Sequence, residues 1–446
     1  MQVIFQKKIN SFNKSIFPDT DKSISIRSFI IGSISEGITK TNNVLESTDV
    51  LQTIKVLKKL GVKIKKIKKG KYEIYGKGLG SFYCKKNTVL NFSNSGTAAR
   101  LIQGCLSTNP GIKVKLMGDK SLNARSMKEL CTILQEFGAK YLPKNKFNFP
   151  LTLISSELPV GIKYSAGISS QIKSAVILAA LNSFGKTNII ENIKSRDHTE
   201  KMLKPNTNAI KIKKGVKNFI EIKGKESLKP MNISVPGDPS SASFYTALCI
   251  LNKNSKIILK RVHINPSRIG FFNIIKKYGG NINFKNKRVQ NNETIVDIHV
   301  KSSKLKPFKI PKKLYVTCVD EFPIIFCLAS IIPGISIIEV NSENLMNKES
   351  NRVLEIKKIL QQIGIKCIVK KDRIKIYGKT NLNTHKKLIN VSGVLDHRIL
   401  MSSSILSLLT GIKSNLKNFE QVSSSCPNFL STIKKLGGKF EVKKIS

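Results

Sequence analysis

Two cations and two hydroxyls lie within seven residues in the stretch DKSISIR, residues 21–27. Lysine and arginine neutralise anions, and serine hydroxyls donate hydrogen bonds to anionic oxygens. Lys22, Ser23 and Arg27 therefore have the chemistry to bind a small phosphorylated molecule. The structural alternative is a solvated basic turn, which is the ordinary role of such residues in a lysine-rich chain.

Further polar side chains stand directly before apolar segments that are predicted to be helices. In NFSNSGTAARLI, Gly96 precedes a helix that carries Arg100, and the N-terminus of a helix attracts anions. Serine, asparagine and threonine also cap helices, so either role fits this stretch equally well. In AGISSQIKSAVILAAL, capping explains one serine but leaves Gln171 unexplained. The first half supplies these other candidates at helix starts: Arg125 in GDKSLNARSM, Ser169 and Ser170 in AGISSQ, and Ser195 and Arg196 in SRDHTEKM.

Charged residues recur in the same way in the second half. CVDEFPIIF places Asp320 and Glu321 after a predicted strand and before Pro323. NLMNKESNRVLEI provides Asn344, Lys348, Glu349 and Arg352 at a helix start, and VLDHRILMSSSIL provides Asp396, His397 and Arg398. Taken singly, a carboxylate near a helix start is more often a cap, and a lone histidine is more often structural. Their recurrence at equivalent positions predicts that the helix starts converge on one cleft.

The elements that would position these residues repeat along the chain. An apolar helical period that ends at a glycine and continues into an alternating strand occurs five times. The glycines are Gly61, Gly138, Gly279, Gly364 and Gly437, each where a helix end favours a left-handed residue. A weaker copy at 197–212 has Pro205 and no glycine. Six repeats, three before residue 240 and three after it, predict an α/β (α+β) protein of two similar domains, with chain crossings near residues 20 and 238.

Length and composition fit a two-domain intracellular protein. The chain has 446 residues, no apolar run long enough to span a bilayer, and no apolar segment of a secretory signal at its start. Its eight cysteines form no C-x-x-C pair, which argues against zinc and disulfides and favours a reducing cytoplasm. The formal charge of +49 suggests nucleic-acid binding, but the lysines are spread along the whole chain. Lysine, isoleucine and asparagine all have A/T-rich codons, so a codon bias explains the charge without a functional demand.

Ten segments resemble, in order and over nearly the whole chain, the 5-enolpyruvylshikimate-3-phosphate synthase family, also called 3-phosphoshikimate 1-carboxyvinyltransferases. The matching stretches are DKSIS-x-R, NSGT-x-x-R, GD-x-SL-x-x-R, SSQIKSA, SRDHTEKML, VPGDPSSA, NP-x-R-x-G, DE-x-P, KES-x-R and DHR. Each is weak alone, whereas ten in order are specific. The sequences SRDHTEKM and SSQIKSAVILAAL are similar to those of the second class of the family, as is Ser424, where many members carry lysine.

The resemblance implies the enolpyruvyl transferase fold, an inside-out α/β barrel in which each of two lobes contains three βαββαβ-type repeats. The first lobe would span residues 21–237, and the second would combine 1–20 with 238–446. It implies that phosphoenolpyruvate and shikimate 3-phosphate give 5-enolpyruvylshikimate 3-phosphate and phosphate, a step of the shikimate pathway to chorismate and aromatic amino acids. Neither a metal nor an organic cofactor is implied. We expect a cytoplasmic monomer that binds neither membranes nor specific nucleic acids.

The family's functional residues can be carried onto the matching positions. Shikimate 3-phosphate would contact Lys22, Ser23, Arg27, Ser169, Ser170, Gln171, Ser195, Arg196, Asp320, Asn344 and Lys348. Phosphoenolpyruvate would contact Lys22, Gly96, Arg125, Gln171, Arg352 and Arg398. Several negative charges must share one cleft, which explains why cations from both lobes are needed. For catalysis, Asp320 would take the proton of the 5-hydroxyl, and Glu349, alone or together with Lys22, would protonate C3 of phosphoenolpyruvate.

Several residues depart from the family pattern. Ile26 stands where histidine is usual, Ser126 where proline is usual, Met346 in place of an arginine, and Asn351 in place of an aspartate. None of them is assigned to chemistry, so we expect an active but slower enzyme. Gly96 favours sensitivity to glyphosate, whereas the second-class features favour tolerance.

Three alternative functions fit parts of the sequence. The sister enolpyruvyl transferase, UDP-N-acetylglucosamine 1-carboxyvinyltransferase, shares the fold but carries a cysteine ahead of the position of Arg125, where GDKSLNAR has none. A basic nucleic-acid-binding protein would fit the charge and would bind with steep salt dependence. A degenerate relative that folds without catalysing would fit the departures.

Overall fold

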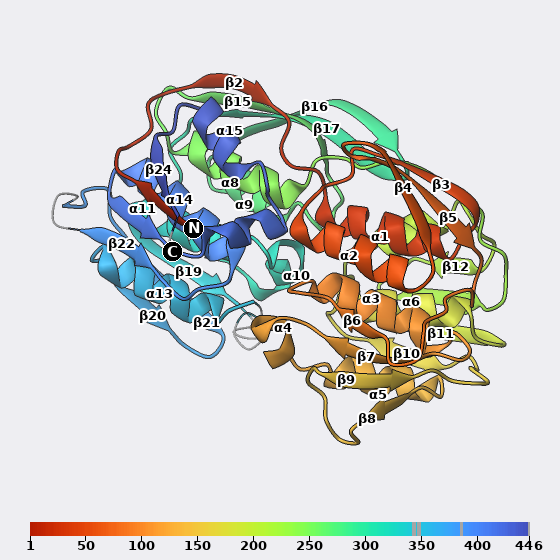
Figure 1. Cartoon of the computed structure of the whole chain (residues 1–446). Helices are drawn as coiled ribbons and strands as arrows, with labels where there is room; N and C mark the ends of the chain where they lie inside the picture. Colours follow the sequence, from red (N-terminus) through yellow and green to blue (C-terminus); the bar gives the residue numbers. More distant parts are fainter. Residues whose placement is uncertain (341–344, 346–348, 384–386, 445–446) are drawn as a thin grey trace. The chain divides into compact units, whose positions relative to one another are not determined.

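The computed structural model describes residues 1–340, 345, 349–383 and 387–444 (Figure 1). The chain divides into two compact units of similar size. We call Thr20–Val235 with Gln290–Asn292 the N-terminal unit, and Met1–Asp19, Pro236–Val289 and Glu293–Ser446 the C-terminal unit. The division therefore falls at Asp19/Thr20 and at Val235/Pro236, and again on either side of the three residues Gln290–Asn292. Each unit is described separately below.

The N-terminal unit contains three four-stranded sheets, each with its own helices. The first has the strand order β14 (Asn232–Ser234), β3 (Glu36–Asn42), β5 (Lys71–Lys77) and β4 (Lys63–Lys68), with α1 (Lys22–Ser33) and α2 (Thr48–Lys59). The second has β6 (Val89–Asn91), β7 (Lys113–Met117), β9 (Leu151–Ile154) and β8 (Lys140–Leu142), with α3 (Gly96–Ser107), α4 (Lys120–Ala124) and α5 (Lys128–Glu136). The third has β10 (Lys163–Ala166), β11 (Lys186–Glu191), β13 (Asn218–Lys223) and β12 (Ile210–Lys213), with α6 (Ser170–Leu181) and α7 (His198–Leu203).

The C-terminal unit repeats this plan three more times. Its first sheet has β2 (Asn13–Ile16), β15 (Lys256–His263), β17 (Glu293–Lys301) and β16 (Asn281–Gln290), with α8 (Pro239–Ile250) and α9 (Gly270–Lys277). The second has β18 (Lys309–Ile310), β19 (Gly334–Glu339), β21 (Arg373–Gly378) and β20 (Cys367–Val369), with η1 (Lys312–Leu314), α10 (Tyr315–Cys318), α11 (Phe322–Ile331) and α13 (Arg352–Gln362). The third has β22 (Leu388–Val391), β23 (Lys413–Leu416), β1 (Gln2–Phe5) and β24 (Phe440–Lys443), with α14 (His397–Thr410), η2 (Phe419–Ser424) and α15 (Phe429–Lys435).

All six sheets begin with a parallel pair, which a helix connects wherever the two strands follow one another in the chain. Examples are β10 with β11 and β22 with β23. The next strand in the sheet then runs antiparallel, as β13 does beside β11. In three sheets the order is completed by a strand from elsewhere in the chain: β14 beside β3, β2 beside β15, and β1 between β23 and β24. This mixed α/β architecture with repeated helices confirms the predicted fold class.

The five glycines predicted to end helices all adopt the left-handed conformation. Their φ angles are 83° at Gly61, 93° at Gly138, 103° at Gly279, 72° at Gly364 and 97° at Gly437. Each follows a helix and precedes a strand, as with α2 and β4. Side chains other than glycine rarely adopt this conformation, which is why the helix stops could be predicted from the sequence.

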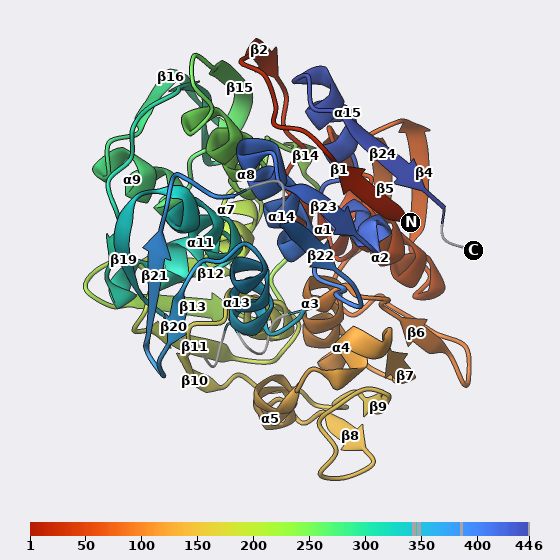
Figure 2. The same ribbon diagram turned by 90° about the vertical axis from the view of Figure 1, so that its left-hand side faces the viewer.

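Six helices are buried almost all round: α1, α3 and α6 in the N-terminal unit (Figure 1), and α8, α11 and α14 in the C-terminal unit (Figure 2). Several of the polar residues singled out above lie at or just before the first turns of these helices: Lys22 and Ser23 at α1, Gly96 at α3, Ser169, Ser170 and Gln171 at α6, Asp320 and Glu321 at α11, and Asp396 and Arg398 at α14. In the N-terminal unit, α3 and α6 pack very closely, because a Cβ atom on Gly104 would lie 2.3 Å from the backbone oxygen of Ala175. The absence of a side chain at Gly104 therefore lets the two helices approach each other closely at this point.

Two local predictions were wrong. Asp320 and Glu321 follow the short helix α10, not a strand; the strand of this region, β18, ends earlier at Ile310. The β-favouring residues of YVTC are overridden because Pro311 interrupts the strand and a helical turn begins directly after it. Arg125 does not start a helix, because it is the C-terminal cap of α4, and α5 begins at Lys128.

Two further features are the state of the cysteines and the length and hydropathy of the helices. All eight cysteines are free thiols, and six of them are buried. Among the described residues, no single helix is both long and apolar enough to cross a membrane, and only the bent pair Lys312–Cys318 with Phe322–Ile331 meets the test of length and composition together.

Candidate active site

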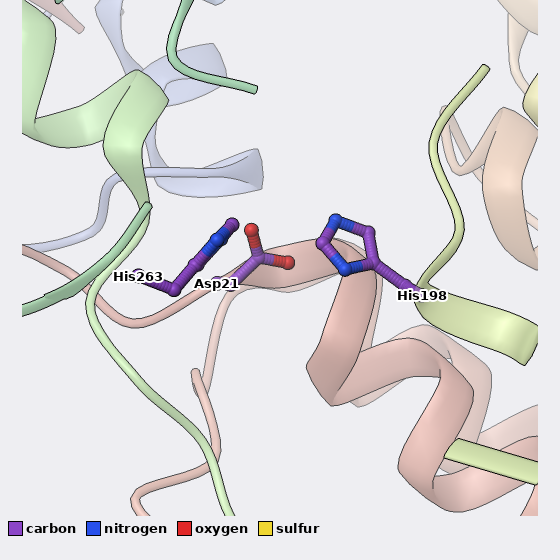
Figure 3. Close-up of side chains that lie close together, drawn as sticks. All are labelled: Asp21, His198 and His263. Atoms are coloured by element: carbon purple, nitrogen blue, oxygen red, sulfur yellow. The ribbon is translucent and has the colours of Figure 1, made fainter. Parts of the chain in front are cut away.

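The start of α1 carries the first cation of the N-terminal unit. Asp21 caps the helix, because its Oδ1 accepts the backbone N–H of Ile24 at 2.7 Å. The next residue, Lys22, donates from Nζ to Oδ2 of Asp49 on α2 at 2.9 Å. His198 at the start of α7 lies close to the same cap, with a ring nitrogen within 4.8 Å of a carboxylate oxygen of Asp21 (Figure 3). The ammonium group of Lys22 is thus held between α1 and α2.

Arg27 lies one turn further along α1 and is buried. Its Nε donates to Oγ1 of Thr199 at 2.8 Å, and one terminal nitrogen donates to Oγ of Ser174 at 3.1 Å. The other terminal nitrogen donates to the backbone oxygen of Ser23 at 3.2 Å. Arg27 and Ser23, both predicted to bind shikimate 3-phosphate, are therefore in direct contact, and α6 and α7 fix the orientation of the guanidinium group.

Two arginines meet at the start of α3. A Cβ atom on Gly96 would lie 2.9 Å from a terminal nitrogen of Arg100 and 3.1 Å from one of Arg125. Arg100 donates to Oε1 of Gln171 at 2.7 Å, and Arg125 donates to the side-chain oxygen of Asn94 and to Oγ of Ser121. Gly96, Arg125 and Gln171 are therefore brought together as predicted from the sequence. A helix N-terminus beside two guanidinium groups is suited to binding an anion.

Apart from Ser23, the serines predicted to bind shikimate 3-phosphate lie at two places in the N-terminal unit, the start of α6 and the loop before α7. Ser169 is the cap of α6, with its Oγ accepting the backbone N–H of Ile172 at 3.4 Å, and Ser170 is the first residue of that helix. Ser195 donates its backbone N–H and its hydroxyl to Oε1 of Glu191, at 2.8 and 2.9 Å. Arg196 follows it, two residues before α7 begins. The capping role considered for Ser169 is thus correct, and it leaves the hydroxyl of Ser170 at the same helix start.

Arg352 organises the C-terminal unit. Its side chain is only 1% exposed, and it reaches three carboxylates: Nε lies 2.8 Å from Asp396, and the terminal nitrogens lie 2.7 Å from Glu349 and 3.4 Å from Asp320. Burial alone would lower the pKa of Arg352, but the carboxylates of Asp396, Glu349 and Asp320 raise it. Asp320 and Glu349, the two predicted catalytic carboxylates, therefore share one guanidinium group.

Arg398 lies beside the same carboxylates. Its terminal nitrogen donates to the backbone oxygen of Asp320 at 3.2 Å and lies 3.8 Å from Glu321, which is fully buried. Burial raises the pKa of Glu321, and Arg398 opposes that shift. The hydroxyl of Ser240, at the start of α8, donates to Glu321, and Arg268 donates to Ser240 at 2.9 Å. The predicted ligand Arg398 is thus linked through Glu321 to residues that follow the second chain crossing.

Neither catalytic candidate is the cap of a helix. Asp320 precedes the cap position of α11, which Glu321 occupies without a side-chain capping bond, and its carboxylate faces Arg352. Glu349 stands before α13, whose cap is Asn351, with Oδ1 accepting the N–H of Leu354 at 3.1 Å. The replacement of the usual aspartate by Asn351 therefore keeps the cap. The predicted ligands Asn344 and Lys348, and the departure Met346, lie outside the described residues.

Sequence reasoning missed several residues that complete these groups. Arg100 and Arg268 stand inside motifs that were recognised but were given no role, and Glu321 is the second acid of DE-x-P. Asp49 carries no sequence signal, because an acidic residue in the first turn of a helix is common. We call Lys22, Arg27, Gly96, Arg100, Arg125 and Gln171 the N-terminal cluster, and Asp320, Glu321, Glu349, Arg352, Asp396 and Arg398 the C-terminal cluster.

Comparison with known proteins identifies the family that these clusters belong to. The model of the EPSP synthase (3-phosphoshikimate 1-carboxyvinyltransferase) family matches residues 6–433. The protein belongs to this family. The 3-phosphoshikimate 1-carboxyvinyltransferase of Zymomonas mobilis is 34% identical over 95% of this chain and 93% of its own length. That of Petrotoga mobilis is 36% identical over 96% of this chain and 97% of its own length.

A solved structure agrees with the family assignment. The EPSP synthase of Acinetobacter baumannii superimposes with a TM-score of 0.85 and 32% identity, and the match covers the whole of both chains. The expected enolpyruvyl transferase fold and the membership in the EPSP synthase family are therefore confirmed. The UDP-N-acetylglucosamine enzyme and a nucleic-acid-binding protein are not favoured, while the assignment to the second class of the family stays a prediction.

Proposed function

We infer that the protein transfers the enolpyruvyl group of phosphoenolpyruvate to the 5-hydroxyl of shikimate 3-phosphate, giving 5-enolpyruvylshikimate 3-phosphate and phosphate. The observation that carries this conclusion is the match to relatives named 3-phosphoshikimate 1-carboxyvinyltransferase. They match the chain over nearly its full length at 34–36% identity. The protein is thus a transferase of the shikimate pathway, which leads to chorismate and the aromatic amino acids. The two clusters support the assignment because both substrates carry a phosphate and a carboxylate.

Shikimate 3-phosphate is assigned to the hydroxyls and cations around α1, α6 and α7. Ser23, Arg27, Ser169, Ser170, Gln171, Ser195 and Arg196 form this set in the N-terminal unit, with Lys22 shared between the two substrates. The contact between Arg27 and Ser23 supports the assignment, since the guanidinium group is already oriented by Thr199 and Ser174. Asp320, Asn344 and Lys348 complete the set from the C-terminal unit.

Phosphoenolpyruvate is assigned to Lys22, Gly96, Arg125, Gln171, Arg352 and Arg398. Gly96 supports this assignment because it leaves room beside two terminal guanidinium nitrogens. We add Arg100 to the set, since it reaches Gln171 at 2.7 Å and flanks the same glycine. A planar guanidinium group can bind a carboxylate or a phosphate through two parallel hydrogen bonds.

The addition step requires two proton transfers, and the elimination that follows requires another at C3. The 5-hydroxyl loses a proton as its oxygen bonds to C2 of phosphoenolpyruvate, while C3 gains a proton and the addition gives a tetrahedral intermediate. The intermediate then loses the proton at C3 and expels phosphate, which restores the double bond. Asp320 is the proposed base at the hydroxyl, and Glu349, alone or with Lys22, is the proposed acid at C3. Their common contact with Arg352, at 3.4 and 2.7 Å, would keep the base and the acid apart but mutually oriented.

Phosphate release is the direct test of this function. The purified protein should release phosphate from phosphoenolpyruvate when shikimate 3-phosphate is present, and not when UDP-N-acetylglucosamine replaces it. Asp320→Asn and Glu349→Gln should each lower kcat by about 10²–10⁴-fold, the usual contribution of a positioned acid or base. Glu339→Gln, at a half-exposed carboxylate on β19, is the matched control and should keep the wild-type rate. Folded protein that releases no phosphate from this substrate pair would make it a relative that no longer catalyses.

The remaining expectations concern the state of the protein in the cell. We propose that it acts as a monomer in the cytoplasm and binds no nucleic acid specifically. Light scattering would give the oligomeric state. Titration with duplex DNA at two salt concentrations would separate weak, steeply salt-dependent attraction to the +49 chain from specific binding.

A further inference from the structure

A lysine lies fully buried in the middle of an apolar helix, and the function described so far does not use it. Lys173 on α6 has a side chain that is 0% exposed. Its Nζ lies 2.6 Å from Oε1 of Glu191, the last residue of β11, and 2.6 Å from Oε1 of Glu200 on α7. Lysine is almost never fully buried unless it is paired, so this ammonium group and its two carboxylates act as one bridge between β11, α6 and α7.

Glu191 extends this bridge to a predicted substrate ligand. The Oε1 atom that contacts Lys173 also accepts the backbone N–H and the hydroxyl of Ser195, at 2.8 and 2.9 Å. Its Oε2 accepts Nδ2 of Asn218 at 2.7 Å. A serine hydroxyl has a single hydrogen, so while it is given to Glu191 it cannot also be donated to a phosphate oxygen.

The segment that begins at Ser195 is also held at its other end, by Ser174, the residue next to Lys173 on α6. Thr199 donates its hydroxyl to Ser174 at 2.8 Å and accepts Nε of Arg27 at 2.8 Å. Lys173 and Ser174 are adjacent in sequence, so two consecutive residues of one helix hold the segment 195–200 at both ends. Arg196 lies between these two attachments.

Burial opposes all three charges of the bridge; it raises the pKa of Glu200, whereas at Lys173 and Glu191 the ion pairs and hydrogen bonds outweigh it. Burial opposes the charged form of Lys173, but Glu200 and Glu191 raise its pKa above the ordinary value. Burial likewise opposes ionisation of Glu191, but Lys173 and the hydrogen bonds from Ser195 and Asn218 lower its pKa. The bond from Lys173 to Glu191 and on to Ser195 is therefore charge-assisted, and such bonds are stronger than neutral ones.

We propose that Lys173 and Glu191 are positioning residues for shikimate 3-phosphate. This revises the role of Ser195 assigned above: Ser195 anchors the segment that presents Arg196 instead of donating to the phosphate itself. This rests on the proposed assignment of that segment to shikimate 3-phosphate. The cation Arg196 then contacts the substrate, and its place is set from inside the unit by the buried bridge.

The first experiment compares two identical substitutions on neighbouring strands. Glu191→Gln keeps the size of the side chain but replaces the charged acceptor by a neutral one. We expect the Kd for shikimate 3-phosphate, measured by calorimetry without the second substrate, to rise about tenfold, the difference between charged and neutral hydrogen bonds. The KM for phosphoenolpyruvate should stay within about twofold of the wild type. Glu221→Gln, at a carboxylate on β13 that is 35% exposed and pairs with Lys186 at 3.3 Å, should change neither constant.

A second pair of variants separates anchoring from direct binding. If Ser195 acts only through Glu191, Ser195→Ala and Glu191→Gln together should weaken binding no more than the stronger single variant. Additive effects, or a loss in Ser195→Ala with none in Glu191→Gln, would overturn the proposal. The double variant Lys173→Met with Glu200→Gln keeps the formal charge of the bridge and leaves Glu191 in place. It should also weaken the binding of shikimate 3-phosphate without changing the KM for phosphoenolpyruvate.

The positioning role and the proposed function can be refuted independently of each other. Amide hydrogen exchange at Ser195 and Arg196 needs no substrate, and Glu191→Gln should accelerate it at least tenfold while Glu221→Gln leaves it unchanged. Wild-type protein that releases no phosphate would refute the function, whereas unchanged exchange in Glu191→Gln would refute the positioning role.

Discussion

Gly96→Ala is the sharpest probe of the N-terminal cluster, because the atoms nearest to the new methyl group belong to the two arginines assigned to phosphoenolpyruvate. Its Cβ would lie 2.9 Å from a terminal nitrogen of Arg100, 3.1 Å from one of Arg125 and 3.8 Å from Leu122. Ordinary van der Waals contact begins near 3.4 Å, so both guanidinium groups must move by a few tenths of an ångström. The flexible ends of these side chains can move, and the backbone of α3 need not.

The expected loss follows from the bonds that the arginines would make. A hydrogen bond to a charged group contributes about 1.5–3 kcal/mol, and about 1.4 kcal/mol corresponds to a tenfold change in affinity. Misplacing one such bond should raise the KM for phosphoenolpyruvate by about 10- to 100-fold. The fold should not lose stability, because alanine favours a helix over glycine by up to about 1 kcal/mol.

The assay is phosphate release at saturating shikimate 3-phosphate with phosphoenolpyruvate varied, together with the Kd for shikimate 3-phosphate and thermal unfolding. Gly215→Ala, on the turn between β12 and β13, supplies a matched control, since its Cβ would meet only the backbone of Lys217. A KM for phosphoenolpyruvate within twofold of the wild type in Gly96→Ala would show that Arg100 and Arg125 do not bind this substrate.

Three other substitutions test how the clusters are supported. Gly104→Ala should lower the free energy of unfolding in denaturant by about 1–3 kcal/mol and weaken the binding of both substrates. The reason is that its Cβ would lie 2.3 Å from a backbone oxygen of α6 and force α3 and α6 apart. A variant as stable as the wild type would contradict the close packing. Arg352→Met should cost about 3–5 kcal/mol by leaving Asp396 buried without its guanidinium partner, and adding Asp396→Asn should recover part of the loss. Burial raises the pKa of Glu321 from its ordinary value of 4.5, so the folded protein binds more protons than the unfolded one above that pH. The contribution of Glu321 to the stability of the wild type should therefore fall as pH rises through this window. The stability of Glu321→Gln relative to the wild type should accordingly increase from pH 4 to pH 7, and a difference that does not change with pH would contradict this reasoning.

The repeat could be predicted from the sequence because its signals are local. A helix that must stop in a left-handed residue requires glycine there, and Gly61 and Gly364 do adopt positive φ angles. The one copy without a glycine, α7, ends at Leu203 just before Pro205. The predicted strand before Asp320 failed for a related reason, since β propensity is weak and one proline outweighs it.

The supporting residues could not be predicted in the same way, because their partners lie far along the chain. Arg100 meets Gln171 across 71 residues, and Ser240 meets Glu321 across 81. A sequence can nevertheless give one hint. Lys173 stands in the apolar run IKSAVILAAL, where an unpaired ammonium group would be too costly to bury. Such a lysine predicts that a buried acid exists, although it does not say which one.

Net charge and functional charge are distinct in this protein, and burial separates them. The chain has 77 lysines and arginines, yet among the residues that the structure describes the buried cationic side chains are Arg27, Lys173, Arg268, Arg352 and Arg398. All five make hydrogen bonds or ion pairs within or directly behind the two clusters. Exposed charges are screened by salt within about 10 Å, whereas buried ones are screened much less. The exposed lysines can therefore follow the base composition of a genome with little effect on the site, while each buried cation is fixed by its partners.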